Sequence, residues 1–134
     1  MAFEIPVQIL SFTAATAMSA ATEQFCLVKL ASNGNCHLCT AITDKPIGVL
    51  QNSPARGELA EVMVLGVTKL RANVDLAVDD LVGAAATGRA AVYVAGTTGT
   101  SSYIAGRVIA VDATDNDGRV VTAAINCLSP TRGV

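Results

Sequence analysis

The fold is indicated first by the hairpin sequence of residues 25–42, FCLVKLASNGNCHLCTAI. Two segments with the composition of strands, Phe25–Ala31 and Cys36–Ile42, flank the turn sequence Ser32-Asn33-Gly34-Asn35. Asn-Gly favours tight two-residue turns, because both residues tolerate the left-handed backbone that these turns require. We therefore expect an antiparallel β-hairpin in this stretch.

Further short apolar segments continue this pattern along the chain. Turn sequences such as Asn52-Ser53-Pro54 and Asp117-Gly118 separate them. Many short strands with regular turns are typical of a sandwich or barrel. The sequence predicts an all-β domain, a small antiparallel β-sandwich or barrel with an extended N-terminal arm. Expected strands are Ile47–Gln51, Glu61–Gly66, Thr68–Ala72, Ala90–Ala95, Ile104–Asp112 and Arg119–Asn126. We expect no long helix, and residues 77–86 could form at most one helical turn.

The N-terminal segment alternates between apolar and other residues, with Phe3, Ile5, Val7 and Ile9 at the apolar positions. This period of two predicts a strand, and Pro6 assigns the strand to a sheet edge or to a position outside the main sheet, because proline has no N–H to donate. Residues 11–24 are small and polar, so we predict an arm and connector at 1–24 and a β-domain at 25–134. The apolar residues of the arm, with Phe12, either fill the domain's own core or contact another chain, and we favour contact with another chain.

The composition excludes several classes of protein. Hydrophobic residues make up 51% of the chain and charged residues 15%, with a net charge of −2. This argues against disorder and against nucleic-acid binding by bulk positive charge. An average domain has about 25% charged residues, so we expect another protein to cover part of this charge-poor surface. We expect no membrane span, because no run of 18 apolar residues occurs, and no secretory signal, because Glu4 precedes the first basic residue, Lys29.

Cys36-His37-Leu38-Cys39 is the motif that most suggests metal or redox chemistry. A zinc site needs about four ligands, and only the distant Cys26 and Cys127 could complete this one. Residues three apart on a strand also point to opposite faces, so Cys36 and Cys39 are predicted to be structural. Zinc would remain an alternative if the motif formed a turn instead. With four cysteines and no disulfide framework, we expect folding in a reducing compartment.

The acidic residues give no better indication of an active site. Residues 112–118 do not fit the EF-hand calcium pattern and are predicted to form a hairpin turn instead. The neighbouring Asp79 and Asp80 are assigned to a solvated loop rather than to an acid pair. Because no nucleophile, base and orienting residue come together, we expect no enzyme activity, cofactor or metal.

Several short sequence blocks follow one another between residues 10 and 128. They are LSFTA (10–14), QFCLVKL (24–30), IGVLQN (47–52), PARGE (54–58), VMVLGVTKL (62–70), DDLV (79–82), GRA (88–90) and AGRVI (105–109). Their order resembles that of the capsid cement, or head decoration, proteins of tailed bacteriophages. The chain departs from this family in its cysteine pair and in the stretch before Leu10.

The resemblance implies a compact β-domain without catalytic residues that binds the outer surface of the assembled head. Its expected partners are the major capsid protein and further copies of itself, most often in a trimer. The implied location is the exterior of the capsid in the virion, after folding in the host cytoplasm. The arm would then contact the capsid protein or a sister subunit. The alternatives are another phage structural β-protein, from a tail tube or baseplate, and a small zinc-binding or ligand-binding β-module.

Overall fold

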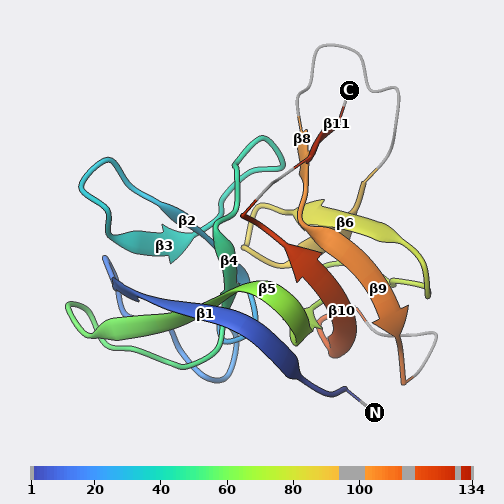
Figure 1. Ribbon diagram of the computed structural model, residues 1–134, viewed down its shortest axis with the longest axis horizontal. Coiled ribbons are helices and arrows are strands. Elements are labelled where there is room, and N and C mark those ends of the chain that lie inside the picture. Colours follow the sequence, from blue (N-terminus) through green and yellow to red (C-terminus); the bar gives the residue numbers. More distant parts are fainter. Residues whose placement is uncertain (1, 94–101, 113–116, 129–130, 134) are drawn as a thin grey trace.

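The computed structural model describes residues 2–93, 102–112, 117–128 and 131–133, which form strands joined by turns and loops (Figure 1). None of these residues belongs to a helix that is long and apolar enough to span a membrane. The strands are β1 (Ile5–Thr13), β2 (Leu27–Leu30), β3 (Cys36–Leu38), β4 (Gly48–Leu50), β5 (Leu59–Arg71), β6 (Leu81–Ala84), β7 (Ala90–Val92), β8 (Ser102–Ile104), β9 (Gly106–Ala110), β10 (Val120–Asn126) and β11 (Thr131–Gly133).

The hairpin predicted from Asn33-Gly34 is confirmed as β2 and β3. The two strands pair antiparallel, with Leu30 opposite Cys36. Gly34 has a φ of +85°, a left-handed conformation that glycine adopts without steric cost. The N–H of Ala31 donates to the carbonyl oxygen of Asn35 and closes the turn.

The main sheet has nine strands, and its pairings are antiparallel. Its strands follow the order β3-β2-β4-β5-β10-β9-β6-β7, and β1 adds to β5, while β8 and β11 form a separate two-stranded sheet. The sheet curls, and single parallel bridges join Ala14 to Cys36 and Ala72 to Ala90. The predicted all-β fold is therefore confirmed in the form of a curled antiparallel sheet, a half-barrel.

The long strand β5 is the element around which the molecule is built (Figure 1). It pairs with β4 near its start and with β10 over its second half, while β1 follows its opposite edge. It also supplies side chains to two buried clusters. The first cluster includes Met63, Leu70, Val82, Val108, Val121 and Ile125. The second cluster consists of Ala14, Met18, Val28, Cys36, Leu50, Ala60, Val62 and Val64.

Four elements differ from the sequence prediction. The strand expected at Ile104–Asp112 is interrupted at Ala105, because Ile104 ends β8 in the two-stranded sheet whereas β9 begins at Gly106 in the main sheet. The two strands expected at 61–66 and 68–72 are one strand, because Gly66 continues the β10 ladder with a φ of +138° instead of ending the strand. Residues 81–84 form β6, where at most a helical turn was expected. The strand expected at Ala90–Ala95 ends at Val92, and its last two residues lie outside the described part of the chain.

The segment predicted as an arm lies on the chain's own sheet. β1 pairs antiparallel with β5, from Ile5 opposite Val67 to Thr13 opposite Leu59. Within the described residues β1 pairs with no other strand, which confirms the prediction that it lies at an edge. The connector is likewise packed, since Ala14 and Met18 are buried in the second cluster. The structure thus joins residues 2–24 to the domain predicted at 25–134.

Candidate docking surface

Strand β1 presents a row of apolar side chains to solvent. The exposed fractions are 41% for Phe3, 57% for Ile5, 68% for Val7 and 43% for Ile9. The structure thus brings together four of the five predicted contact residues on one segment. The fifth, Phe12, is half-buried and packs against the second cluster.

The register of β1 explains this division. The pairing with β5 shifts on both sides of Gln8, between Pro6 and Gln8 and between Gln8 and Ile9. From Ile9 to Thr13 the register is regular, and there Leu10 and Phe12 reach the second cluster.

Natural edge strands usually carry charges that discourage pairing with other chains. Residues 5–13 carry none, so β1 is open to contact except at Pro6.

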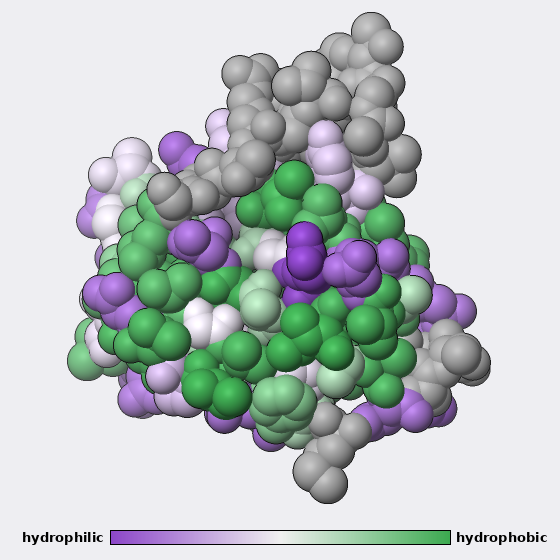
Figure 2. Space-filling model, turned by 45° about the vertical axis from the view of Figure 1, so that its right-hand side comes forward, coloured by the Kyte–Doolittle hydropathy of each residue, from purple (hydrophilic) through white to green (hydrophobic). Residues whose placement is uncertain are grey.

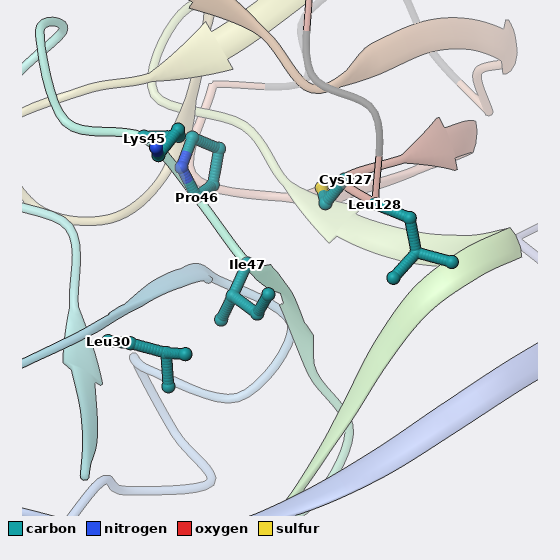
Figure 3. A pocket seen from close by; sticks show the side chains of 6 residues that line it. All are labelled: Leu30, Lys45, Pro46, Ile47, Cys127 and Leu128. Carbon is teal, nitrogen blue, oxygen red and sulfur yellow. The ribbon is translucent and has the colours of Figure 1, made fainter. Parts of the chain in front are cut away.

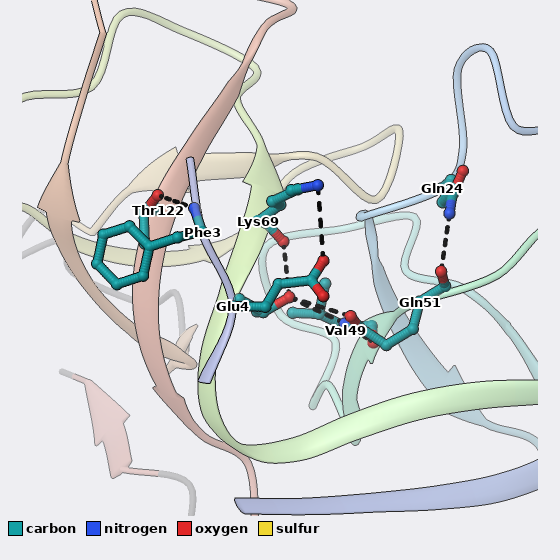
Figure 4. A network of polar contacts seen from close by, with 8 residues as sticks. Phe3, Glu4, Gln24, Val49, Gln51, Lys69 and Thr122 are labelled. Carbon is teal, nitrogen blue, oxygen red and sulfur yellow. Dashed lines mark hydrogen bonds and ion pairs between the residues drawn. The ribbon is translucent and has the colours of Figure 1, made fainter. Parts of the chain in front are cut away.

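Residues 2–7, which we call the strap, are joined to the domain by the ladder with β5 at Ile5 and Pro6 and by polar contacts of Phe3 and Glu4 (Figure 4). The backbone N–H of Phe3 donates to Oγ1 of Thr122, at 3.1 Å. Oε1 of Glu4 lies 3.9 Å from Nζ of Lys69, and both side chains are more than a third exposed. Nζ of Lys69 also lies 5.3 Å from the ring centre of Phe25. The partners Lys69 and Thr122 face each other across β5 and β10, so the strap reaches over the sheet.

Sequence reasoning missed these strap partners. Phe3 and Thr122 are separated by 119 positions, and nothing local to either residue indicates the contact. Thr122 is fully buried, an uncommon place for a hydroxyl, which is consistent with its accepting a hydrogen bond.

A second apolar surface is a groove between the ends of β2, β4 and β10 (Figure 3). Its volume is about 270 Å³, and Leu30, Lys45, Pro46, Ile47, Cys127 and Leu128 line it. Lys45 is the charged residue among them, and its Nζ lies 6.0 Å from the ring centre of Tyr103. The lining residues come from three distant stretches of the chain, so the sequence alone did not indicate the groove.

The side of the molecule that carries β6, β9 and β10 is also largely apolar (Figure 2). A shallow groove of about 310 Å³ lies there, between Leu81, Arg107 and Ile125. Nε of Arg107 lies 3.3 Å from Oδ1 of Asp79, and both side chains are mostly exposed. The surface thus combines apolar area with an exposed ion pair, a mixture that is common at protein interfaces.

The four cysteines are free and buried. Cys36 and Cys39 are separated as predicted, since Cys36 of β3 belongs to the second cluster and Cys39, just after β3, belongs to the first. Burial raises the pKa of Cys39 and of Cys127 to about 12. Burial also raises the pKa of Cys26 to about 11, although Arg71 and Arg89 act in the opposite direction. These thiols are neutral at physiological pH and have the character of core residues.

The acidic residues considered above serve separate local roles. Asp79 pairs with Arg107, whereas Oδ2 of Asp80 accepts a hydrogen bond from the N–H of Ala77 at 2.8 Å. Residues 113–116 of the considered calcium loop lie outside the described part of the chain. Among the described residues, no group of three or more His, Cys, Asp or Glu is placed to hold a metal ion.

The whole described domain is similar in fold to the base of a phage head fibre. The crystal structure of the N base of head fiber gp8.5 in bacteriophage phi29 matches 90% of this chain and 94% of that chain, with a TM-score of 0.59. The two sequences are 17% identical, so the likeness shows a shared fold. No protein-family model matches the chain, and a search of curated proteins finds no match.

Proposed function

We propose that this protein is a structural component of a bacteriophage head, where it decorates the outer capsid surface and stabilises contacts between major capsid protein subunits. The observation that carries the proposal is the fold shared with the base of a head fibre over nearly the full length of both chains. The sequence blocks between residues 10 and 128 support the same assignment through their resemblance to head decoration proteins.

The physical features of the domain suit such a role. A protein that binds the assembled head, and not free capsid subunits, stabilises the assembled state by mass action. It needs a rigid domain and a contact surface, and no catalytic group. The two buried clusters supply the rigidity, and the exposed apolar row on β1 supplies contact area. We therefore propose a non-enzymatic, cofactor-free role on the capsid exterior.

The proposed contacts are Phe3, which precedes β1, and Ile5, Val7 and Ile9 of β1, which would be buried against the capsid protein or a sister subunit. Exposed apolar surface of this kind marks interaction sites in stable proteins. We further propose that the protein forms a homotrimer. Light scattering should give three times the chain mass of 13.6 kDa, and a monomer at high concentration would contradict a trimer in solution.

The direct test is cryo-electron microscopy of heads purified from the phage that encodes the chain. We expect copies of the domain on the outer surface, and heads made without the gene should release their DNA at a lower temperature than wild-type heads. Adding the purified protein back should restore the release temperature. Detection of the chain in isolated tails but not in heads would overturn the proposal in favour of a tail component.

A further inference from the structure

The chain contains the same arrangement of strands twice. In the first repeat, β2 pairs with β3 and β4, and β5 pairs with β4 and β1. In the second repeat, β6 pairs with β7 and β9, and β10 pairs with β9 and the second half of β5. The same residue pairs recur when residues 9–15, 23–39, 47–51 and 57–63 are set against 67–73, 77–93, 105–109 and 118–124. β5 therefore ends the first repeat and begins the second.

The turns and the unusual backbone conformations repeat as well. Phe25 and Asp79 are equivalent, and they are the non-glycine residues with a positive φ in the described part of the chain. Gly34 and Gly88 are equivalent glycines in the β2–β3 and β6–β7 turns, and each donates its N–H to the carbonyl oxygen three residues earlier. Identical residues occupy further equivalent positions: Ala14 and Ala72, Leu27 and Leu81, Val28 and Val82, Gly48 and Gly106, Gly57 and Gly118.

The two repeats meet in a junction that the chain makes once. The N–H of Arg71 donates to the carbonyl oxygen of Phe25 at 2.9 Å, and the N–H of Leu27 donates to the carbonyl oxygen of Gly88 at 2.6 Å. A Cβ at Gly88 would lie 3.1 Å from the carbonyl oxygen of Leu27. Leu27 and Val49 of the first repeat are fully buried in the first cluster, among side chains of the second repeat.

The equivalents of both junction surfaces are open at the outer sides of the two repeats. On the second repeat, the side chains of Asp79 and Arg107 are 78% and 60% exposed, and Leu81 and Arg107 line the groove of about 310 Å³ on the apolar side (Figure 2). On the first repeat, Thr13 is exposed, whereas its equivalent in the junction is half-buried. A Cβ at Gly34 would meet nothing within 4 Å.

A second copy of the chain supplies the neighbour that each open surface lacks. Structural repeats bury their faces against adjacent repeats, so the first and last repeat each keep one uncovered face. The second repeat of one copy can cover the first repeat of the next in the way that the junction already shows within one chain. Because the two surfaces differ, the contact is heterologous, and it closes into a ring if the rotation between copies allows.

We infer that copies of this chain associate head to tail, with Asp79, Leu81 and Arg107 of one copy docked on Thr13 and Gly34 of the next. The subunit interface thereby continues the junction between the repeats. This inference rests on the proposed homo-oligomer and specifies its interface. It is independent of binding to heads.

The test is disulfide trapping at positions equivalent to a contact in the junction. A backbone hydrogen bond joins Phe25 and Arg71, so positions 79 and 13 of neighbouring copies should come equally close. The variant Thr13→Cys/Asp79→Cys is treated with copper phenanthroline and oxygen, which takes two electrons and two protons from each pair of thiols. We expect covalent oligomers on a non-reducing denaturing gel, joined between positions 13 and 79 according to mass spectrometry. The four native cysteines are buried and should not compete.

The variant Thr13→Cys/Ala86→Cys is the matched control. Ala86 is exposed too, but its equivalent, Ser32, lies beyond the far end of β2 from Phe25, so no link to position 13 is expected. A 13–79 link confined to the monomer band, no 13–79 link in any band, or an equal yield of links in the control would each overturn the inference. Binding of the reduced variant to heads is measured separately. An interchain link without head binding would count against the head function alone, and head binding without the link against the interface alone.

Discussion

At the scale of single residues, Gly66 is a position on β5 where the backbone of β1 leaves no room for a Cβ. Gly66→Ala adds a Cβ that collides with the backbone of Ile5 and Val7, and backbone atoms cannot move aside cheaply. Gly57→Ala is the matched control, because Gly57 also has a positive φ but has nothing within 4 Å of the added Cβ. We expect Gly57→Ala to lower the free energy of unfolding by about 1–2 kcal/mol from backbone strain alone. Gly66→Ala should lower it by about 1–3 kcal/mol more, measured by urea unfolding.

The buried cysteines predict a loss of stability at high pH. Cys39 and Cys127 have pKa values of about 12 in the folded protein, against an ordinary value of 9.0. The folded state therefore keeps these protons while the unfolded chain releases them above pH 9.0, so their stabilising contribution is complete below that pH and is lost as the pH rises toward 12. Urea midpoints should fall between pH about 8 and pH about 11, and the fall should be shallower in Cys127→Ala. An equal fall in both proteins would show that other groups are responsible.

A related prediction concerns metal. Because Cys36 and Cys39 belong to different clusters, we expect the purified protein to contain no stoichiometric zinc. Overnight treatment with EDTA should leave the urea midpoint unchanged. Metal analysis that finds one zinc ion per chain would contradict this assignment of the cysteines. The separation of Cys36 and Cys39 was predicted from sequence, although Cys39 lies just after β3 and not within it, whereas the grooves depend on residues that are far apart in the chain.

At the scale of elements, β1 combines a structural half and an exposed half. In the double variant Ile5→Ser/Val7→Ser, we expect a change of less than about 1 kcal/mol in the free energy of unfolding, because both side chains are mostly exposed. The same variant should lose most of its binding to heads, measured by co-sedimentation. Val78→Ser is a matched control, since Val78 is 57% exposed but lies before β6. Equal binding by the double variant and the wild type would remove β1 from the contact surface.

The sequence predicted elements best where the local pattern was sufficient. The hairpin of β2 and β3 follows from Asn33-Gly34, and the edge position of β1 follows from Pro6. The continuity of β5 was missed because a glycine usually indicates a break, yet here both neighbouring strands hold Gly66 in the sheet. β6 was missed because the stretch from 77 to 86 was considered only as a helical turn, broken by Asp79, Asp80 and Gly83, whereas Gly83 lies within the strand.

At the scale of the whole molecule, β5 couples the two clusters. We expect Leu70→Ala in the first cluster and Leu50→Ala in the second to destabilise the protein by about 2–5 kcal/mol each. Both variants should still unfold in one transition, because neither cluster persists without β5. Amide hydrogen exchange read at Val64 and Val121 checks this, since both amides should lose protection to the same extent in each variant. Loss of protection at only one of them would show that the clusters unfold independently.

The pairing of β5 with β10 also has a consequence for how the protein is made. Residues Leu65–Arg71 of β5 can pair with β10 only after Val120–Asn126 have been synthesised, about fifty residues later in the chain. Until β10 has left the ribosome, the second half of β5 has an unpaired edge and the first cluster lacks Val121 and Ile125. Folding of this cluster is therefore delayed until β10 is available, and the nascent chain carries an aggregation-prone edge between the synthesis of β5 and that of β10.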